Sequence, residues 1–417
     1  MLIPLFLAAT ISLHVSPNRL ASAGIDAPVV ESHLAVDPAD PKHLVGTAIV
    51  GDDPQTTVCA TFLSRDGGET WTSARLPVVA CADPWAIVGP NQTIVTVLAG
   101  VPALGIDEAL LVFRSADGGA TWLPPLPLAT AVDHETLFAD RRDPAKQRLY
   151  TLGVIGNRVE GHVRGDVFLA RSDNWITFPR ITRVTPHNLN FNTFTGAVLR
   201  DGTVVVSYGD FMPWTKGPKA RLEKGRTWML ASHDGGVTFG APLLIAEGCT
   251  KQFPVLAADP ADDTLYFLCA SEDARRLAVY RSRDRGESWT DPLPVPADAE
   301  GTTLHGANIA VGKNGLLLVS WMRETDAVKH CNGFFAAASG DGGDTFTKPV
   351  RVSDGTPCNV TERNAKIVKN NEHGGDYYGL AADRDGVFHL VWSDSRNGVY
   401  QLWSASVTAA LALDSKH

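Results

Sequence analysis

The sequence predicts an all-β fold, a seven-bladed β-propeller, and three observations support this prediction. A short motif built around Asp and Gly recurs along the chain, and a pair of apolar strands recurs with it. The strands are rich in Val, Ile, Leu and aromatic residues, and Asp, Gly and Pro separate them. Repetition at a fixed period indicates one stacked unit, and a closed ring of small sheets protects its strand edges.

The recurring motif, which we call the Asp turn, reads Ser-x-Asp-Gly-Gly-x-Thr followed by an aromatic residue. It is complete at Ser64–Trp71, further copies surround Asp117, Asp234, Asp284 and Asp341, and a worn copy surrounds Asp173. A tight turn between antiparallel strands needs positive φ, which glycine adopts freely, and an Asp carboxylate can accept bonds from the turn's own N–H groups. We therefore expect these carboxylates to be structural rather than catalytic.

The apolar strand pairs are more numerous than the Asp turns. Seven pairs occur, starting near His33, Trp85, Leu137, Gly196, Val255, Asn308 and Gly379. The pairs predict seven blades, whereas the six Asp turns alone give a six-bladed propeller as the alternative. The seventh unit has a third strand at 400–407 but no evident fourth strand. We expect residues just before Ser32 to supply that outer strand.

The N-terminus has the pattern of a secretory signal. An apolar run from Leu2 to Val15 is followed by the small-residue triplet Ala21-Ser22-Ala23. This pattern predicts a signal peptide over 1–23, cleaved after Ala23, and a single propeller domain over 24–417. We therefore expect a secreted or periplasmic protein. The apolar run is too short for a stable membrane span.

The six cysteines form three pairs that are local in sequence: Cys59 with Cys81, Cys249 with Cys269, and Cys331 with Cys358. Cys59 and Cys331 each precede an Asp turn, and their partners follow the same turn. Equivalent places in two repeats favour disulfides, although six cysteines allow fifteen connectivities. Disulfides also fit an exported protein.

Composition and charge exclude several classes of function. The formal charge is −9, and no cluster of Lys and Arg marks a surface for a phosphate backbone, so we expect no nucleic-acid partner. The sequence contains no phosphate loop, no dinucleotide fingerprint and no His-x-x-x-His pair. We therefore predict no cofactor and no metal, and we expect a monomer.

The Asp turns at Asp66, Asp117, Asp234, Asp284 and Asp341 resemble those of the sialidase or BNR (Asp-box) repeat superfamily, over residues 31 to 407. The stretch 374–403 also resembles bacterial secreted sialidase-like proteins. The resemblance implies a propeller with Asp-box turns and an activity on carbohydrate. True sialidases have six blades and an early Arg-Ile-Pro motif, whereas this chain has no arginine between Arg19 and Arg65. We therefore do not transfer the sialidase arginine triad.

Candidate site residues lie where the first strands begin and the second strands end, on the face opposite the Asp turns. Glu31, His33 and Asp83 fall on this face without an assigned role. The candidate catalytic groups are Asp133 or Glu135 as acid and Tyr377 or Tyr378 as nucleophile. The candidate substrate-binding residues are Trp85, His134, Lys251, His305, Arg323, Asp376 and Arg396.

Three functions fit this set. The first is a secreted, sialidase-like glycoside hydrolase acting on an acidic glycan, in the manner of an exo-α-sialidase. The second is a non-catalytic propeller that binds a glycan or a protein. The third is a polysaccharide lyase on uronate-containing glycans, in which His134, His305, Tyr377 and Lys251 remove a proton and neutralise the carboxylate.

Overall fold

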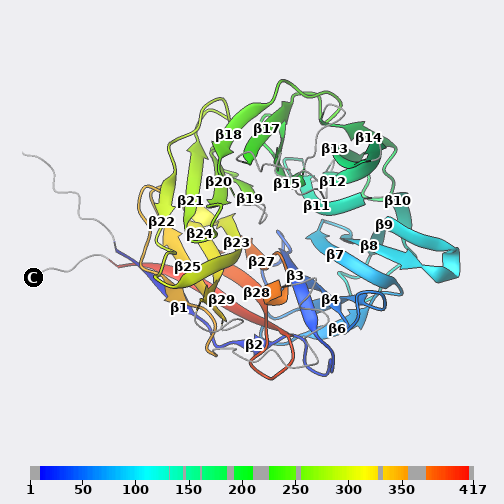
Figure 1. Cartoon of the computed structure of the whole chain (residues 1–417), viewed down its shortest axis with the longest axis horizontal. Coiled ribbons are helices and arrows are strands. Elements are labelled where there is room, and N and C mark those ends of the chain that lie inside the picture. The colour runs from blue at the N-terminus through cyan, green and yellow to red at the C-terminus, as the bar shows by residue number, and fades with distance from the viewer. Residues whose placement is uncertain are drawn as a thin grey trace, which may run out of the picture.

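The structure is a computed structural model, and it describes residues 10–130, 132–143, 147–159, 162–185, 192–209, 225–249, 255–326, 332–355 and 372–412. Within these ranges the chain forms seven antiparallel sheets, and they are arranged as blades in a ring (Figure 1). The predicted seven-bladed propeller is confirmed, and the six-bladed alternative is wrong. Lys251, Cys331 and Cys358 lie outside the described residues.

Each of the first four blades is a meander of four strands in sequence order. Blade 1 contains β3 (Val29–Val36), β4 (Leu44–Val50), β5 (Val58–Ser64) and β6 (Thr72–Arg75). Blade 2 contains β7 (Val79–Val88), β8 (Thr93–Val101), β9 (Ile106–Ser115) and β10 (Leu126–Ala129). Blade 3 contains β11 (Val132–Asp140), β12 (Arg148–Val159), β13 (His162–Ser172) and β14 (Arg180–Arg183). Blade 4 contains β15 (Asn192–Val198), β16 (Val204–Gly209), β17 (Arg226–Ser232) and β18 (Leu243–Glu247).

The last three blades complete the ring. Blade 5 contains β19 (Val255–Ala258), β20 (Leu265–Ala270), β21 (Leu277–Ser282) and β22 (Leu293–Val295), and blade 6 contains β23 (Thr302–Val311), β24 (Leu317–Thr325), β25 (Asn332–Ser339) and β26 (Val350–Arg351). Blade 7 contains β27 (Gly379–Ala382), β28 (Phe388–Asp394) and β29 (Gln401–Ala412). The described helices are the short 3-10 turns η1 (Pro102–Leu104), η2 (Lys313–Gly315) and η3 (Glu372–Gly374), and none has the length or apolarity to cross a bilayer.

The outer strand of blade 7 comes from the N-terminus. Strand β1 (Thr10–Val15) pairs antiparallel with β29, from Thr10 opposite Ala412 to Val15 opposite Val407, and β2 (Arg19–Leu20) pairs with the same strand further along. Side chains of β1 pack on the apolar cluster between blades 6 and 7. The ring is therefore closed by residues before Ser32, as expected. These residues lie inside the segment predicted as a signal peptide, so cleavage after Ala23 would remove this strand.

The hydrophobic core is divided into seven clusters, one at each junction between neighbouring blades. Side chains alternate between the two faces of a strand, so each blade contributes to two clusters. In β24, Leu317, Val319 and Trp321 pack toward blade 5, whereas Leu318 and Met322 pack toward blade 7. This two-sided burial explains why the inner strands read as continuous apolar runs.

Each Asp turn connects the third strand of its blade to the fourth. In the first turn, Ser64 Oγ donates to Asp66 Oδ1 at 2.8 Å and the Thr70 N–H donates to the same oxygen at 2.9 Å. The same bonds recur at Asp117, Asp234, Asp284 and Asp341. Burial raises the pKa of Asp66, but the hydrogen bonds from Thr70 and Ser64 outweigh it and lower that pKa to about 2.

The worn copy of the Asp turn differs from the prediction by one residue. Asn174, rather than Asp173, accepts the bonds from Ser172 Oγ at 3.1 Å and from the Thr177 N–H at 2.9 Å. Asp173 instead forms an ion pair with Arg171 at 2.7 Å. An amide oxygen can accept the same turn bonds as a carboxylate, so the turn tolerates the substitution.

Two of the predicted disulfides are confirmed. Cys59 on β5 is bonded to Cys81 on β7, so the bridge joins blade 1 to blade 2. Cys249, just after β18, is bonded to Cys269 on β20, so the second bridge joins blade 4 to blade 5. Both disulfides therefore link neighbouring blades covalently. The third predicted pair stays a prediction.

Candidate active site

A β-bulge interrupts the first strand of several blades at one equivalent position. Its register shifts fall between Val30 and His33, Ala82 and Trp85, Asp133 and Thr136, Thr193 and Gly196, and His305 and Asn308. Bulges re-aim side chains and are frequent beside functional sites. The first strands also contact one another in order around the ring. The bulges therefore bring side chains from several blades to one place near the axis.

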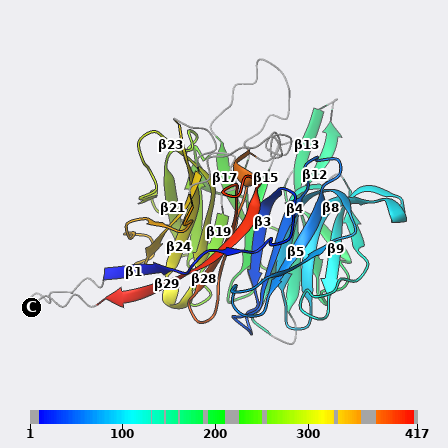
Figure 2. The ribbon, with the colours of Figure 1, turned by 90° about the horizontal axis from the view of Figure 1, so that it is seen from below.

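The bulges hold three non-glycine residues in the left-handed region. Glu31 has a φ of 55°, Asp83 of 48° and His134 of 51°, and the equivalent residue of blade 6 is Gly306 at 53°. A non-glycine residue in this region costs on the order of 1 to 3 kcal/mol, and such strain gathers at functional sites. Figure 2 shows the ring from the side, with the strands running between its two faces. Because neighbouring strands alternate in direction, these positions near the start of the first strands lie on the face opposite the Asp turns, which follow the third strands.

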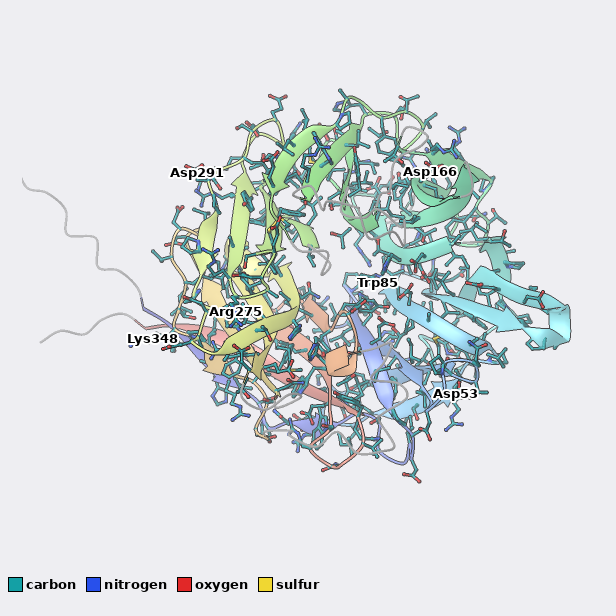
Figure 3. The ribbon with its side chains drawn as sticks, viewed as in Figure 1. Asp53, Trp85, Asp166, Arg275, Asp291 and Lys348 are labelled. Carbon is teal, nitrogen blue, oxygen red and sulfur yellow. A yellow bond between two sulfur atoms is a disulfide. The ribbon has the colours of Figure 1, made fainter. Side chains whose placement is uncertain are left out.

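A cavity of about 170 Å³ opens beside these bulges. The residues that line it come from blades 1 to 7: His33, Asp83, Trp85, His134, Glu135, Thr136, Thr195, Val255, Ala307, Asn308, Ile309, Tyr377, Tyr378 and Leu380. Figure 3 labels Trp85 near the centre of the ring. No arginine or lysine is among the described residues that line this cavity.

Carboxyl groups dominate the electrostatics at the cavity. Glu31, Asp83, Asp133, Glu135 and Asp376 interact through their charges. Burial, together with the charges of Asp83 and Asp376, raises the pKa of Glu31 well above its ordinary value, although the Asp376 N–H partly offsets this. Glu31 therefore keeps its proton to a higher pH than an isolated carboxyl does.

Glu135 is the most isolated of these acids. It is 1% exposed, and neither of its carboxyl oxygens has a hydrogen-bond partner among the described residues. Burial, and next the charge of Asp83, raises the pKa of Glu135 well above its ordinary value. These surroundings favour the neutral form of the carboxyl, whose O–H can donate to a group in the cavity.

Asp83 lies in a different environment. Its Oδ2 accepts a hydrogen bond from the backbone N–H of His134 at 3.1 Å. Burial raises the pKa of Asp83, the proximity of His134 lowers it, and the net result is a pKa of about 6. Asp133 is more open, with a 42% exposed side chain, and its Oδ2 lies 3.8 Å from His134 Nε2.

Aromatic rings form one wall of the cavity. The His33 ring is stacked on Trp85 with centroids 3.9 Å apart, and Tyr377 lies 5.5 Å from Trp85 in a tilted arrangement. His33 Nδ1 accepts the Ala86 N–H at 3.2 Å, and burial lowers the pKa of His33 to about 3, so this ring is neutral. A half-buried indole with a cavity beside it is a platform on which a sugar ring can stack.

The predicted nucleophiles have different surroundings. Tyr377 lines the cavity, and burial together with Glu31 and Asp83 raises its pKa well above the ordinary value. Tyr378 is 1% exposed, packs edge-on against Phe334, and donates its O–H to the His373 carbonyl. Tyr377 is therefore the tyrosine that reaches the carboxyl cluster, and Tyr378 supports the wall.

The two predicted substrate-gripping arginines do not line the cavity. Arg323 donates to the Ala297 carbonyl at 2.9 Å and covers the Phe335 ring at 4.3 Å. Arg396 pairs with Asp394 at 2.5 Å and lies over Trp403 at 4.1 Å. Of the other candidates, Trp85, His134 and Glu135 line the cavity, Asp133 and Asp376 act on it through their charges, and His305 lies in a separate cluster.

Sequence reasoning placed Glu31, His33 and Asp83 on this face but gave them no role. One feature of the sequence could have drawn attention to Glu31 and Asp83. Both residues, like His134, precede the apolar part of their first strand by the same number of residues. That offset is the bulge position, where a side chain turns toward the axis.

Comparison with known proteins gives similarity of fold alone. No protein-family model matches the chain, and no curated protein matches it by sequence. Its structure is similar to a protein of unknown function from Dyadobacter fermentans, with 12% identity over 95% of this chain and 99% of that chain and a TM-score of 0.54. It is similar to a GH93 α-L-arabinofuranosidase of Fusarium graminearum, with 12% identity over 94% and 98% and a TM-score of 0.51. It is also similar to a Hadza microbial sialidase, with 13% identity over 98% of both chains and a TM-score of 0.50.

Proposed function

We propose that this propeller is a glycoside hydrolase in which Glu135 is the general acid. The observation that carries the proposal is a buried carboxyl without a hydrogen-bond partner, opening on a cavity that also presents Trp85. Glycosidases need one carboxyl that is protonated and one that is ionised at the same pH. The two similar propellers with named activities are a sialidase and an arabinofuranosidase, which supports the choice of glycoside cleavage.

Asp83 is the second carboxyl in this mechanism. With a pKa of about 6 it is ionised near neutral pH, whereas burial and the charge of Asp83 raise the pKa of Glu135 and favour its protonated form. Glu135 donates its proton to the glycosidic oxygen as the bond to the anomeric carbon breaks. Asp83 either attacks that carbon or removes a proton from the attacking water, and the anomer released first distinguishes the two routes. We expect activity to rise as Asp83 ionises and to fall as Glu135 ionises.

The charge of the cavity favours a neutral sugar. An anionic substrate needs Arg or Lys to offset its carboxylate, and the described cavity residues include neither. The carboxyl cluster would repel a sialoside or a uronate. We therefore rank a neutral glycoside ahead of the acidic glycan that the sequence suggested, and the same charge argument ranks the lyase below the hydrolase. The two interblade disulfides support an oxidising compartment, secreted or periplasmic.

A substrate screen tests this proposal. The purified full chain is incubated with 4-nitrophenyl glycosides of arabinofuranose, xylose, galactose and sialic acid, and with a uronate polysaccharide whose unsaturated product is followed by absorbance. Glu135→Gln is the matched control, because it keeps the side-chain shape and removes the acid. We expect turnover of a neutral glycoside that Glu135→Gln slows. Turnover of the sialoside or the uronate alone would contradict the proposal, and binding without turnover on every substrate would favour a non-catalytic propeller.

A further inference from the structure

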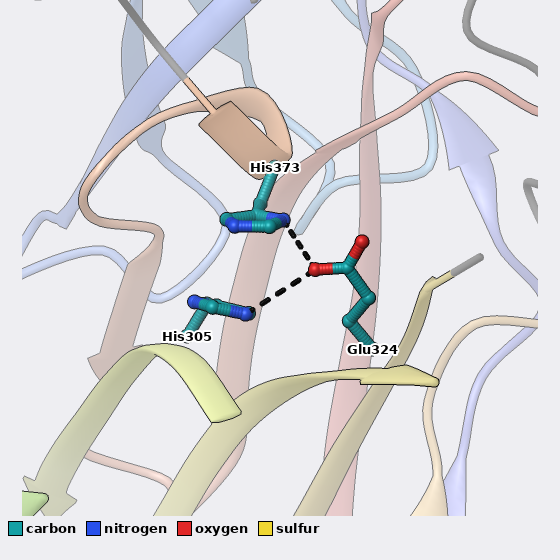
Figure 4. Close-up of side chains that lie close together, drawn as sticks. All are labelled: His305, Glu324 and His373. Carbon is teal, nitrogen blue, oxygen red and sulfur yellow. Dashed lines mark ion pairs between the residues drawn. The ribbon is translucent and has the colours of Figure 1, made fainter. Parts of the chain in front are cut away.

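A second polar cluster lies between blades 6 and 7 and none of its members lines the cavity. It contains His305 on β23, Glu324 near the end of β24, and His373 in the η3 turn. Figure 4 shows both imidazoles directed at one oxygen of the carboxylate. His373 Nδ1 lies 2.8 Å from Glu324 Oε2, and His305 Nε2 lies 3.4 Å from the same oxygen. Two neighbouring paired strands of blade 6 and the η3 turn before blade 7 therefore converge on one point.

The cluster is enclosed by the protein. The side chain of Glu324 is 8% exposed, that of His305 11% and that of His373 14%. His373 has a φ of 64°, which a residue with a side chain adopts at a cost in free energy. The protein thus holds the His373 ring over its partners in a strained backbone conformation.

We propose that His305, Glu324 and His373 bind a divalent transition-metal ion, with Zn²⁺ as the preferred ion. The ligand atoms of these three side chains all lie within 4.8 Å of one another. At zinc bond lengths of about 2.0 to 2.1 Å, the ligand atoms of a tetrahedral shell are about 3.3 Å apart, close to the His305 and Glu324 separation. Two imidazoles and one carboxylate are a zinc donor set with the fourth position left open, whereas Ca²⁺ and Mg²⁺ prefer oxygen ligands throughout.

Binding requires one small rearrangement. The two rings are stacked with centroids 3.6 Å apart and an interplanar angle of 16°. The lone pairs of an imidazole lie in its plane, so both rings can reach one ion only if one of them turns about its Cβ–Cγ bond. We expect His373 to turn, because it lies on a three-residue turn rather than in a sheet. The Thr303 hydroxyl, 3.1 Å from His305 Nε2, is placed to bind a water in the open position.

The ion would join blade 6 to the start of blade 7. Its third ligand residue also shapes the cavity wall, because the His373 carbonyl accepts the O–H of Tyr378 and the Tyr378 carbonyl accepts Asn308 Nδ2 at 2.9 Å. The sequence expectation of no metal rested on the lack of a local His pair. Here His305 and Glu324 lie on the paired strands β23 and β24, and His373 reaches them from the η3 turn about fifty residues further along the chain.

Metal content tests the proposal without reference to turnover. The full chain is freed of metal with a chelator, given Zn²⁺, passed through gel filtration and measured by elemental analysis. We expect one tightly bound Zn²⁺ per chain, and a loss of affinity of about 100-fold or more in His305→Gln and His373→Gln, since losing even an outer-shell partner costs 10- to 100-fold. His389→Gln is the matched control, because His389 contacts a carboxylate, Asp383, at 2.9 Å with no second imidazole, and it should bind like the wild type.

Cobalt substitution gives a second readout that does not depend on the folding of any variant. Co²⁺ bound by the wild-type chain should give the intense visible absorption of a four-coordinate site. A wild-type chain that retains no Zn²⁺ and gives no such spectrum would overturn the proposal. Zn²⁺ retained by both His variants but lost from Asp83→Asn would also overturn it, because the ion would then occupy the Asp83, Asp133 and His134 group. Either failure leaves the proposed hydrolase intact, because neither measurement involves a glycoside.

Discussion

Replacing Asp83 with Asn should stabilise the protein at neutral pH. The folded state raises the pKa of Asp83 from 3.8 to about 6. A carboxyl with a raised pKa holds its proton more tightly in the folded chain, so stability is lost as the pH rises from 3.8 to 6 and stays lost above that range. The shift of 6 − 3.8, about 2 pH units at 1.36 kcal/mol each, corresponds to about 3 kcal/mol. Asp83→Asn should recover most of that free energy at pH 7.5 and almost none at pH 4.

Urea unfolding followed by tryptophan fluorescence measures this difference at both pH values. Asp66→Asn is a control in which the change in stability should have the opposite sign. Hydrogen bonds lower the pKa of Asp66 to about 2, so its ionised carboxylate stabilises the folded state at pH values above the unfolded pKa, and this stabilisation is lost as the pH falls toward 2. That variant should be less stable than the wild type at pH 7.5, and the difference should shrink as the pH falls. An Asp83→Asn variant whose stability gain is the same at both pH values, or that is destabilised at pH 7.5, would refute the reasoning.

Three other predictions follow from the wall, the disulfides and the closing strand. Trp85→Ala should raise KM about tenfold with little change in kcat, because the indole supplies stacking rather than chemistry; a fall in kcat alone would contradict this role. The double variant Cys59→Ala, Cys81→Ala opens a link with a sequence separation of 22 and should lower the free energy of unfolding by about 3 kcal/mol, measured in urea; an unchanged midpoint would contradict it. A chain that starts at Gly24 lacks β1 and exposes the edge of β29, so it should aggregate on gel filtration. Mass spectrometry of the protein isolated from its native cells and their medium gives the natural N-terminus, and a monomeric, equally stable chain from Gly24 would show that β1 is dispensable.

The fold was predictable because its determinants are local. Each Asp turn satisfies its own carboxylate within a few residues, and each strand pair carries its own apolar pattern, so repeats could be counted from the sequence. The closing strand was harder to assign. An apolar run followed by small residues has the composition both of a signal peptide and of a buried β-strand, and only the pairing of Thr10–Val15 with β29 identifies a strand.

The candidate site was predictable in position and only partly in membership. Strand entrances predicted the face on which the cavity opens, and Glu135 and Trp85 line that cavity. Arg323 and Arg396 stand at comparable places in the sequence, yet their guanidinium groups turn to Ala297 and Asp394. Sequence position gives the end of a strand on which a long side chain starts, whereas its direction depends on partners from other blades. The His305, Glu324 and His373 cluster was not predicted for a similar reason, because His373 comes from a segment that is distant in sequence from the other two residues.

The dependence of the rate on the leaving group tests most directly whether Glu135 donates a proton to the glycosidic oxygen. Rates of wild type and Glu135→Gln are compared on a dinitrophenyl glycoside, whose leaving group needs no proton, and on an oligosaccharide of the same sugar, whose leaving group does. We predict a loss of about 10²- to 10⁴-fold on the oligosaccharide and a much smaller loss on the dinitrophenyl glycoside. Equal losses on the two substrates would contradict the assignment of Glu135 as the acid.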